Sequence, residues 1–527
     1  MKRTLVVSAV LALLFALPLA ADDGARDNGA RNEAVAAARA WHGEHGAEIV
    51  AELAALLEIP NVASDGPNIR ANAEAIATAF RRRGAEMELL TLPDAPEVPP
   101  VVFGTLPAEE GADTAPTLVL YVHYDGQPVD PAQWTFGPWT PTLTTAAVEA
   151  GGTARPLPAP GEAIDPEWRL YARAASDDKA PLVALTAALD ALAAAGVPRR
   201  THVKLFFEGE EEAGSPHLAR YVDRYAERLA ADGWLFLDGP VHQSGRPQIF
   251  FGVRGYTGFD LTVYGAERYL HSGHYGNWAP NPILELSRLV ASMKDADGRV
   301  LVDGFYDTVA PLGEAEREAM AAVPPFEEGL RHELALVDNE GGNEVRYAER
   351  IALPSLNVRG FVGATVGETA RNVIPTTATA SFDVRLVAGN EPEAMLDLVE
   401  AHLRRQGYHV VAEEPGVEVR REHAKVARFV RRGGGYRAVR TPLDSPLSQL
   451  AVAAAEAAAR RELVLLPTLG GSLPLYLIED GLGVPVVGVP IANHDNNQHA
   501  PDENLRLANL WYGVDLFAAL LAGGAVE

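Results

Sequence analysis

The chain has 527 residues, of which 47% are apolar, and a formal net charge of −26 that results from 71 acidic and 45 basic residues. This length exceeds that of a usual single domain, and together with the apolar content it predicts a globular protein of more than one domain. The excess of acid argues against nucleic acid as a partner, because phosphate backbones require a basic surface. The lack of cysteine excludes disulfides, thiolate zinc sites and lipid anchoring at a cysteine.

The first residues have the layout of a secretory signal peptide. Lys2 and Arg3 precede an apolar run from Leu5 to Leu19, and Ala20-Ala21-Asp22 follow. We therefore expect residues 1–21 to be a signal peptide and the mature protein to be secreted or periplasmic. An uncleaved anchor is the alternative. The run is short for a membrane span and no later stretch is long and apolar enough, so stable membrane insertion is not expected.

The next part of the chain alternates between helix and strand patterns. The pattern predicts helices at 33–58, 68–83 and 180–195, strands at 87–92, 101–106, 117–122 and 201–207, and a long loop at 126–165. Such alternation is typical of a mostly parallel sheet covered by helices. Long loops of this kind are often functional in compact domains.

The pattern changes near Arg254-Gly255. Alternating strands at 259–264 and 379–387, helices at 282–293 and 391–405, and a linker rich in glycine and arginine at 431–437 precede a helix at 445–460, a strand at 484–489 and a helix at 505–521. The predicted fold class is therefore α/β, with a mostly parallel main domain in two pieces, residues 22–255 and 436–527. An α+β domain, residues 256–435, interrupts it.

Five short motifs carry histidine or acidic residues. They are His123-Tyr124-Asp125, Ser176-Asp177-Asp178-Lys179, Glu210-Glu211-Glu212, Leu237-Asp238-Gly239 and Gln498-His499-Ala500. Four of the five follow a strand-like apolar run, and open α/β sheets gather their sites beyond the carboxyl ends of strands. Carboxylate and imidazole are ligands that zinc accepts when thiolate is unavailable. Together the motifs predict a two-metal hydrolase site.

Each motif alone has a simpler explanation. The aspartate pair at 177–178 suits a helix N-terminus, the glutamates at 210–212 a solvated charge run, Asp238 a turn, and His499 a polar loop that also contains His494 as a competing ligand. However, adjacent glutamates that leave a buried strand repel one another, and nearby cations relieve that repulsion.

In this order and spacing the motifs resemble the carnosinase-like branch of the di-zinc exopeptidases, kin of glutamate carboxypeptidases, aminoacylases and succinyl-diaminopimelate desuccinylases. The resemblance runs from about residue 40 to the end. The matching segments are His123 to Pro128, Tyr171 to Lys179, Glu208 to Ser215, Leu270 to Gly273, Asn372 to Pro375, Asp383 to Arg385, Gly470 to Ser472, and His499 with Glu503. One departure is Ala174, which stands where the family often has glycine.

The resemblance implies a role for each metal-site residue. His123 and Asp238 would bind one cation, Glu212 and His499 the other, and Asp177 would bridge both through a cis peptide to Asp178. Two further residues complete the chemistry: Asp125 would orient His123, and Glu211 would be the general base. The two cations would be divalent, with zinc preferred and manganese or cobalt as alternatives.

The resemblance also gives roles to the inserted domain, which would act as a lid and dimerisation domain. His271 would reach into the site of the partner subunit of a homodimer. Arg385 would bind the substrate carboxylate, with Asn372 and the turn of Gly470, Gly471 and Ser472 beside it. The expected activity is hydrolysis of dipeptides or short peptides with a free C-terminal carboxylate. Two alternatives stay open: an N-acyl amino acid deacylase or desuccinylase on the same site, and a non-catalytic secreted binding protein.

Overall fold

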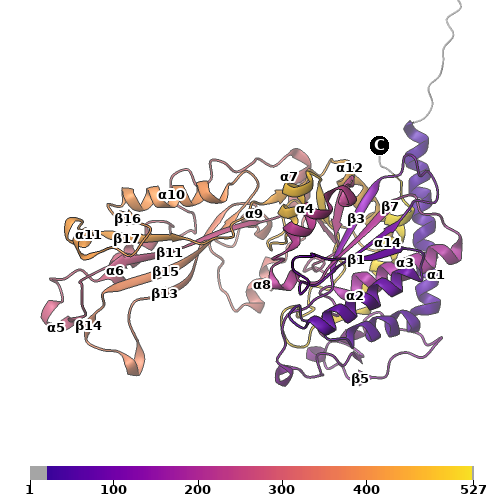
Figure 1. Ribbon diagram of the computed structural model, residues 1–527, viewed down its shortest axis with the longest axis horizontal. Helices are drawn as coiled ribbons and strands as arrows, with labels where there is room; N and C mark the ends of the chain where they lie inside the picture. Colours follow the sequence, from indigo (N-terminus) through magenta and orange to yellow (C-terminus); the bar gives the residue numbers. More distant parts are fainter. Residues whose placement is uncertain (1–19, 525–527) are drawn as a thin grey trace, which may run out of the picture.

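The computed structural model describes residues 20–524 and consists of a catalytic part from which a long lid extends (Figure 1). Most of the predicted signal peptide, residues 1–19, lies outside the described residues. Among residues 20–524, none of the helices combines the length and the apolar content that crossing a membrane requires.

The catalytic part is built on an eight-stranded sheet with the strand order β1-β2-β7-β3-β8-β20-β9-β19. In that order the strands are Glu86–Leu90, Val101–Leu106, His202–Glu208, Thr117–His123, Gly233–Phe236, Val486–Gly488, Gln248–Phe250 and Val464–Leu466. The four central strands, β7, β3, β8 and β20, pair in parallel, and antiparallel neighbours flank them. The carboxyl ends of the central strands therefore meet at one edge of the sheet, where the predicted motifs begin.

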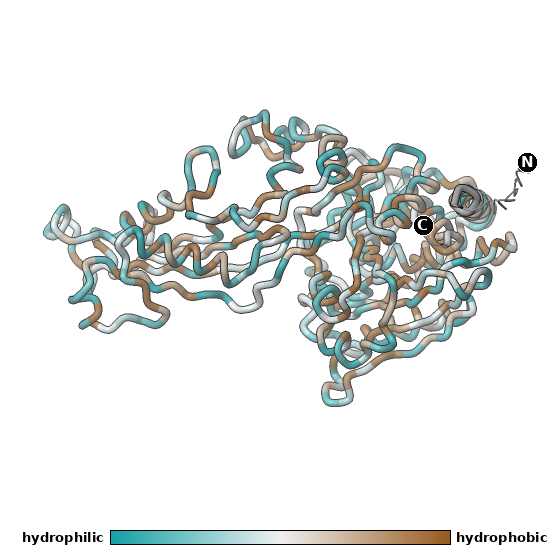
Figure 2. The backbone as a smooth tube through the Cα atoms, turned by 90° about the horizontal axis from the view of Figure 1, so that it is seen from above, coloured by the Kyte–Doolittle hydropathy of each residue, from teal (hydrophilic) through white to brown (hydrophobic). Residues whose placement is uncertain are grey.

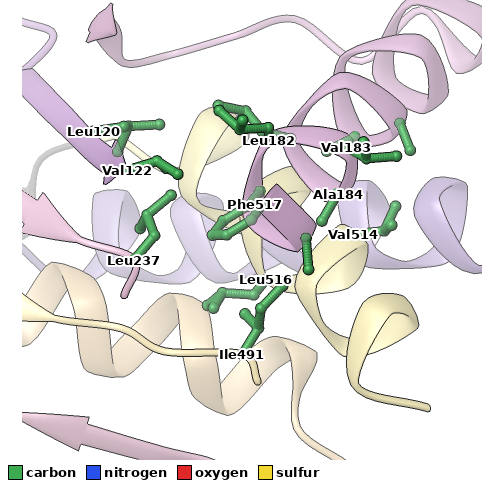
Figure 3. Close-up of a cluster of buried hydrophobic side chains, with 14 of the residues drawn as sticks. Leu120, Val122, Leu182, Val183, Ala184, Leu237, Ile491, Val514, Leu516 and Phe517 are labelled. Atoms are coloured by element: carbon green, nitrogen blue, oxygen red, sulfur yellow. The ribbon is translucent and has the colours of Figure 1, made fainter. Parts of the chain in front are cut away.

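Helices cover both faces of this sheet. One face carries α1 (Ala20–Leu57), α2 (Gly66–Arg81), α3 (Lys179–Ala195), α12 (Pro446–Ala458) and α14 (Leu507–Ala522), and the other carries α4 (Leu218–Leu229) and α13 (Leu475–Leu482). Helix α3 is buried along almost its whole length because α1 and α14 both pack on it. In this core Leu182 of α3, Phe517 of α14 and Val122 of β3 are all buried (Figure 3). The packing fixes the start of α3 against the end of β3.

The predicted long loop 126–165 contains more structure than its composition indicated. A four-stranded sheet in the order β21-β6-β4-β5 joins it to later parts of the chain, with β4 at Thr142–Thr144, β5 at Ala154–Arg155, β6 at Arg169–Tyr171 and β21 at Asn504–Arg506. Strands of two or three residues are too short to give a visible alternation in sequence. The pairing of β6 with β21 brings the segment after Tyr171 beside the segment before Asn504.

The lid is a five-stranded sheet in the order β13-β15-β11-β17-β16. These strands are Ser355–Val362, Thr377–Leu386, Gly255–Tyr264, Val426–Arg431 and His409–Val411, and α6 (Pro282–Ala291) and α10 (Pro392–Arg405) share its core. Burial alternates along most of β11 and β15, as predicted for a half-buried sheet. Apolar segments run along the strands of both parts, while many surface loops are hydrophilic (Figure 2).

The chain enters the lid at Gly255, where a close backbone approach leaves no room for a side chain. A Cβ at this position would lie 2.5 Å from the amide nitrogen of Ala438 and from the carbonyl oxygen of Tyr436. Strand β10 (Gly252–Val253) pairs with β18 (Val439–Arg440) directly before it. The predicted linker at 431–437 thus lies against the strand that enters the lid. The chain therefore enters and leaves the lid along two neighbouring, paired segments.

Three short helices within the predicted lid range pack on the catalytic part instead. They are α7 (Glu314–Ala322), α8 (Glu327–Glu333) and α9 (Tyr347–Ile351). Val323, Phe326 and Ala348 of this segment belong to the core around α4 and α13. The lid domain therefore sends residues 314–351 back to the catalytic part, which the sequence did not indicate.

Candidate active site

His123 ends strand β3 and is completely buried. Its Nδ1 lies 3.4 Å from Oδ1 of Asp125, and its Nε2 lies 2.9 Å from Oδ1 of Asp177. The two carboxylate oxygens of Asp125 also accept hydrogen bonds from the backbone N–H groups of Glu211 and Glu212, both at 3.1 Å. One buried carboxylate thus holds the imidazole and fixes the start of the glutamate segment.

Asp177 lies between β6 and α3, and its peptide bond to Asp178 is cis, as the resemblance implied. Its Oδ1 faces His123, and its Oδ2 lies 3.2 Å from Nε2 of His499. His499 comes from the loop before β21 and is also 3.2 Å from Oε2 of Glu212. The two oxygens of Asp177 therefore face histidines from two separate segments of the chain, which is the arrangement of a bridging carboxylate.

The described residues form two groups of possible metal ligands. Within each group, all the ligand atoms lie within 4.8 Å of one another. One group is His123, Asp178 and Asp238, and the other is Asp177, Glu212 and His499. The structure thus brings together every predicted metal-site residue and adds Asp178. His494, the competing histidine, is in neither group.

The polar atoms of these groups suit divalent cations. Both carboxylate oxygens of Asp178 and Oε1 of Glu212 are buried and have no hydrogen-bond partner among the described residues. Buried carboxylate oxygens without partners are costly, and cations satisfy them. A donor set of imidazole nitrogens and carboxylate oxygens is one that zinc, manganese and cobalt accept.

The charges in the cluster shift one another's ionisation. Burial, with Asp177 adding to it, raises the pKa of Asp238 to about 7. Burial also raises the pKa of Glu211 well above its usual range, although the nearby His123 opposes this. Hydrogen bonds to Asp177 and Glu212 raise the pKa of His499 to about 10. Protons and cations are thus alternative ways of neutralising the same carboxylates.

A buried charge pair holds the segment that carries Asp177. Glu503, which is completely buried, accepts hydrogen bonds from the backbone N–H groups of Ala174, Ser176 and Asp177 at 2.9–3.0 Å and pairs with Arg173 at 2.8 Å. Ala174 has a φ of +62°, a conformation that favours glycine, which accounts for the family preference at this position. Sequence analysis noted Glu503 only as part of the resemblance. Its position before the short strand β21 gave no sign of this role.

Gln127 is a further contact that sequence analysis did not single out. Its Nε2 donates a 2.7 Å hydrogen bond to Oε2 of Glu212. It follows Asp125 closely in the same motif, and that proximity was the only signal in the sequence.

Arg385 lies at the end of β15 nearest the catalytic part. Its Nη1 donates a 3.0 Å hydrogen bond to Oγ of Ser472, and its Nε lies 2.9 Å from Oδ2 of Asp383. Ser472 in turn donates to the carbonyl oxygen of Arg254. The predicted contact of Arg385 with the turn at Gly470, Gly471 and Ser472 is thus present.

Helix α5 (Ser272–Tyr275) and strand β14 (Val373–Ile374) lie at the end of the lid that is far from the catalytic part (Figure 1). His271 directly precedes α5 and Asn372 directly precedes β14, so both lie away from the metal-ligand groups of their own chain. Strand β12 (Leu270–His271) pairs with β14, and the N–H of Ser272 donates to the carbonyl oxygen of Asn372. The expectation that Asn372 lies beside Arg385 is therefore wrong within one chain. Arg385 lies near the C-terminal end of the ten-residue strand β15, whereas Asn372 precedes its N-terminal end.

The family model for peptidase family M20/M25/M40 matches residues 119–523, about three quarters of the chain. The chain belongs to this family. This match and the metallopeptidase relatives described next confirm the predicted fold class and the assignment as a metallopeptidase.

Curated relatives extend over most of the chain. It is 26% identical over 489 residues to the Cys-Gly metallodipeptidase dug1 of Schizosaccharomyces pombe, covering 89% of this chain and 94% of the relative. It is 27% identical over 462 residues to human Beta-Ala-His dipeptidase, covering 84% and 82%. Among solved structures, the M20 family metallo-carboxypeptidase Sso-CP2 from Sulfolobus solfataricus superposes with a TM-score of 0.69 at 26% identity, covering 90% and 99%.

We expect Glu503→Gln to destabilise the protein and weaken its hold on metal. The substitution leaves Arg173 buried without a counter-charge, and breaking a buried pair costs about 3–5 kcal/mol. Thermal unfolding and elemental analysis after gel filtration measure the two effects. Glu462→Gln is the matched control, because that side chain is 86% exposed. Unchanged stability and metal content in Glu503→Gln would contradict this role.

Proposed function

We propose that the protein is a metal-dependent dipeptidase that hydrolyses dipeptides or short peptides with a free C-terminal carboxylate. The observation that carries the proposal is the placement of Arg385 and Ser472 where the lid meets the catalytic part, which also holds the two metal-ligand groups and Glu211. The dipeptidase names of the two curated relatives support it.

His123 and Asp238 would hold one divalent cation, Glu212 and His499 the other, and Asp177 would bridge both. Asp178 is within reach of the first. Zinc is the preferred metal, with manganese or cobalt as alternatives, because the donors are nitrogen and oxygen. When bound, such a pair of cations polarises a scissile carbonyl and makes a nearby water more acidic.

Glu211 is proposed as the general base. Its backbone N–H is fixed by Asp125, and no hydrogen bond to its carboxylate is found among residues 20–524. This half-buried carboxylate therefore has its acceptor sites free for a water molecule. Glu211 would take a proton from that water as it attacks the carbonyl and would then deliver the proton to the leaving amine. Its raised pKa favours the first step, because a carboxylate with a higher pKa is a stronger base.

The alternative is an N-acyl amino acid deacylase or desuccinylase on the same site, because metal chemistry does not fix the acyl group. A panel of free dipeptides and N-acetyl and N-succinyl amino acids separates the two. We expect dipeptide turnover that a chelator abolishes and added zinc restores. Faster turnover of acyl amino acids, or full activity in metal-free protein, would contradict the proposal.

The two neighbouring glutamates are expected to respond differently to the same substitution. Glu211→Gln should retain both metals and lose roughly a hundredfold or more in kcat, because only proton transfer is removed. Glu212→Gln should lose metal. Each variant is the control for the other, and metal content with steady-state kinetics decides the outcome. Metal loss in Glu211→Gln alone would reverse the two roles.

Arg385 is expected to bind the substrate carboxylate through paired hydrogen bonds. Arg385→Ala should lower kcat/KM for free dipeptides. The expected loss of transition-state binding free energy is about 2–5 kcal/mol, the range for truncating one partner of a buried charge pair. Wild-type enzyme should cleave C-terminally amidated dipeptides poorly, and the variant should discriminate less. Arg224→Ala, at an exposed position of α4, is the control. Equal wild-type turnover of free and amidated substrates would remove this clamp from the mechanism.

We also propose a homodimer in which His271 donates a hydrogen bond to the developing oxyanion in the partner's site. The distance of His271 from its own metal-ligand groups supports this (Figure 1). Mixing inactive His271→Ala and Glu211→Gln subunits should then restore part of the activity, because one hybrid site has both groups intact. No recovery after demonstrated subunit exchange would mean that each site is built from one chain.

Residues 1–21 support export to the periplasm or the medium as a further proposal. Cell fractionation with N-terminal sequencing of the mature protein tests it. A chain that keeps Met1 and stays in the cytoplasm would contradict it.

A further inference from the structure

A small cavity of about 120 Å³ lies between the catalytic part and the segment 314–351. Its walls include Pro240, His242, Phe326, Tyr347, Ile351 and Gly470. An apolar cavity of about 150 Å³ can hold a benzene ring, so this space is of the size of one amino-acid side chain.

The cavity borders the segments that carry the site. Pro240 follows the metal-site residue Asp238 by two residues, and Gly470 and Gly471 directly precede Ser472, the partner of Arg385. His494, from the loop that leads to His499, also lines it. A substrate whose carboxylate is held at Arg385 and Ser472 would therefore have its last side chain next to this cavity.

Histidine, at His242 and His494, is the one residue type among the described lining residues that can carry a charge near neutral pH. Among the described residues around the cavity there is no Asp, Glu, Lys or Arg, and much of the wall is apolar, including Val323, Leu466 and Leu469. Burying a charged side chain without a partner is strongly unfavourable, whereas burying an apolar one is favourable in proportion to its area. The cavity therefore disfavours acidic and basic side chains.

His242 offers a polar group in the wall. His242 is 2% exposed, and its Nδ1 accepts a 3.1 Å hydrogen bond from the N–H of Ser244. The ring hydrogen is thus on Nε2, for which no hydrogen bond is found among residues 20–524. Burial lowers the pKa of His242 to about 4, so the ring is neutral. Phe326 stands at 85° to it with ring centroids 5.1 Å apart.

The outer wall is held in place. Glu327 accepts hydrogen bonds from the N–H groups of Phe326 and Tyr347, at 3.0 and 2.9 Å, and pairs with Arg346. One carboxylate thus ties the start of α8 to the start of α9. The rings of Phe326 and Tyr347 are thereby held together, with centroids 5.4 Å apart, on the aromatic side of the cavity.

We propose that this cavity is the specificity pocket for the side chain of the substrate's C-terminal residue, and that it selects uncharged branched aliphatic or aromatic side chains. The proposal rests on the proposed dipeptidase function and on carboxylate binding at Arg385. It assigns to residues 314–351 a role in choosing the substrate, with Phe326 and Tyr347 as the contacting groups.

Glycyl dipeptides that differ only in the second residue test it. Wild-type kcat/KM for Gly-Leu and Gly-Phe should exceed that for Gly-Gly, Gly-Asp and Gly-Lys at least tenfold. Phe326→Ala, which opens the wall, should reduce the ratio of Gly-Phe to Gly-Gly at least fivefold. Ala348→Leu, which narrows the cavity without removing packing, should reduce turnover of Gly-Phe more than that of Gly-Leu. Leu334→Ala, at a 54% exposed position after α8, is the control and should keep the wild-type order.

The outcomes separate this inference from the proposed function. One outcome is that the wild-type enzyme cleaves dipeptides and turns over Gly-Asp or Gly-Lys as fast as Gly-Leu. In that case the pocket assignment is overturned and the proposed dipeptidase function stands. The same holds if both pocket variants, shown to be folded by circular dichroism, keep the wild-type order. If no dipeptide is cleaved at all, the proposed function fails and the inference fails with it.

Discussion

The gathering of like charges at one edge of a sheet is the constraint on which the rest of this molecule depends. Asp178 and Asp238 lie in one group of ligand atoms and Asp177 and Glu212 in the other, and several of their oxygens have no hydrogen-bond partner among the described residues. Such an arrangement is unfavourable unless cations or protons neutralise it. The apolar side chains of the strands, α3 and α14 pack together behind it and hold the segments that carry the acids (Figure 3).

Two further buried acids keep this cluster in shape without joining it. Asp125 links His123 to the glutamate segment. Glu503 accepts hydrogen bonds from three backbone N–H groups of the segment that carries Asp177, and it also pairs with Arg173. Each acts by accepting backbone hydrogen bonds, so each fixes the path of the chain as well as a side chain. A metal site with this support is preorganised, which limits the reorganisation required when substrate binds.

The catalytic part and the lid have different tasks. The catalytic part holds the metal-ligand groups, whereas the lid brings Arg385 to Ser472 at one end and presents His271 at the other. The tight pairing at Gly255 connects them, and residues 314–351 add a third contribution by closing a pocket on the catalytic part. The metal-ligand groups, the Arg385 contact and the outer wall of the pocket thus come from separate segments of one chain.

Sequence alone predicted the α/β class, the interruption by an α+β insert, and a cluster of candidate metal-site residues, although the choice of His499 over His494 and the roles within Glu210-Glu211-Glu212 came from the family resemblance. Those features leave strong local signals: alternating strand and helix patterns, and acids that directly follow apolar runs. The tertiary structure decided what local patterns do not encode. The burial of Glu503 against Arg173 depends on pairing between β6 and β21, which are more than 300 residues apart. The separation of Asn372 from Arg385 depends on the length and direction of β15, and the return of residues 314–351 to the catalytic part depends on packing against α4 and α13. The first and the last are long-range contacts, which arise from packing that no short stretch of sequence specifies.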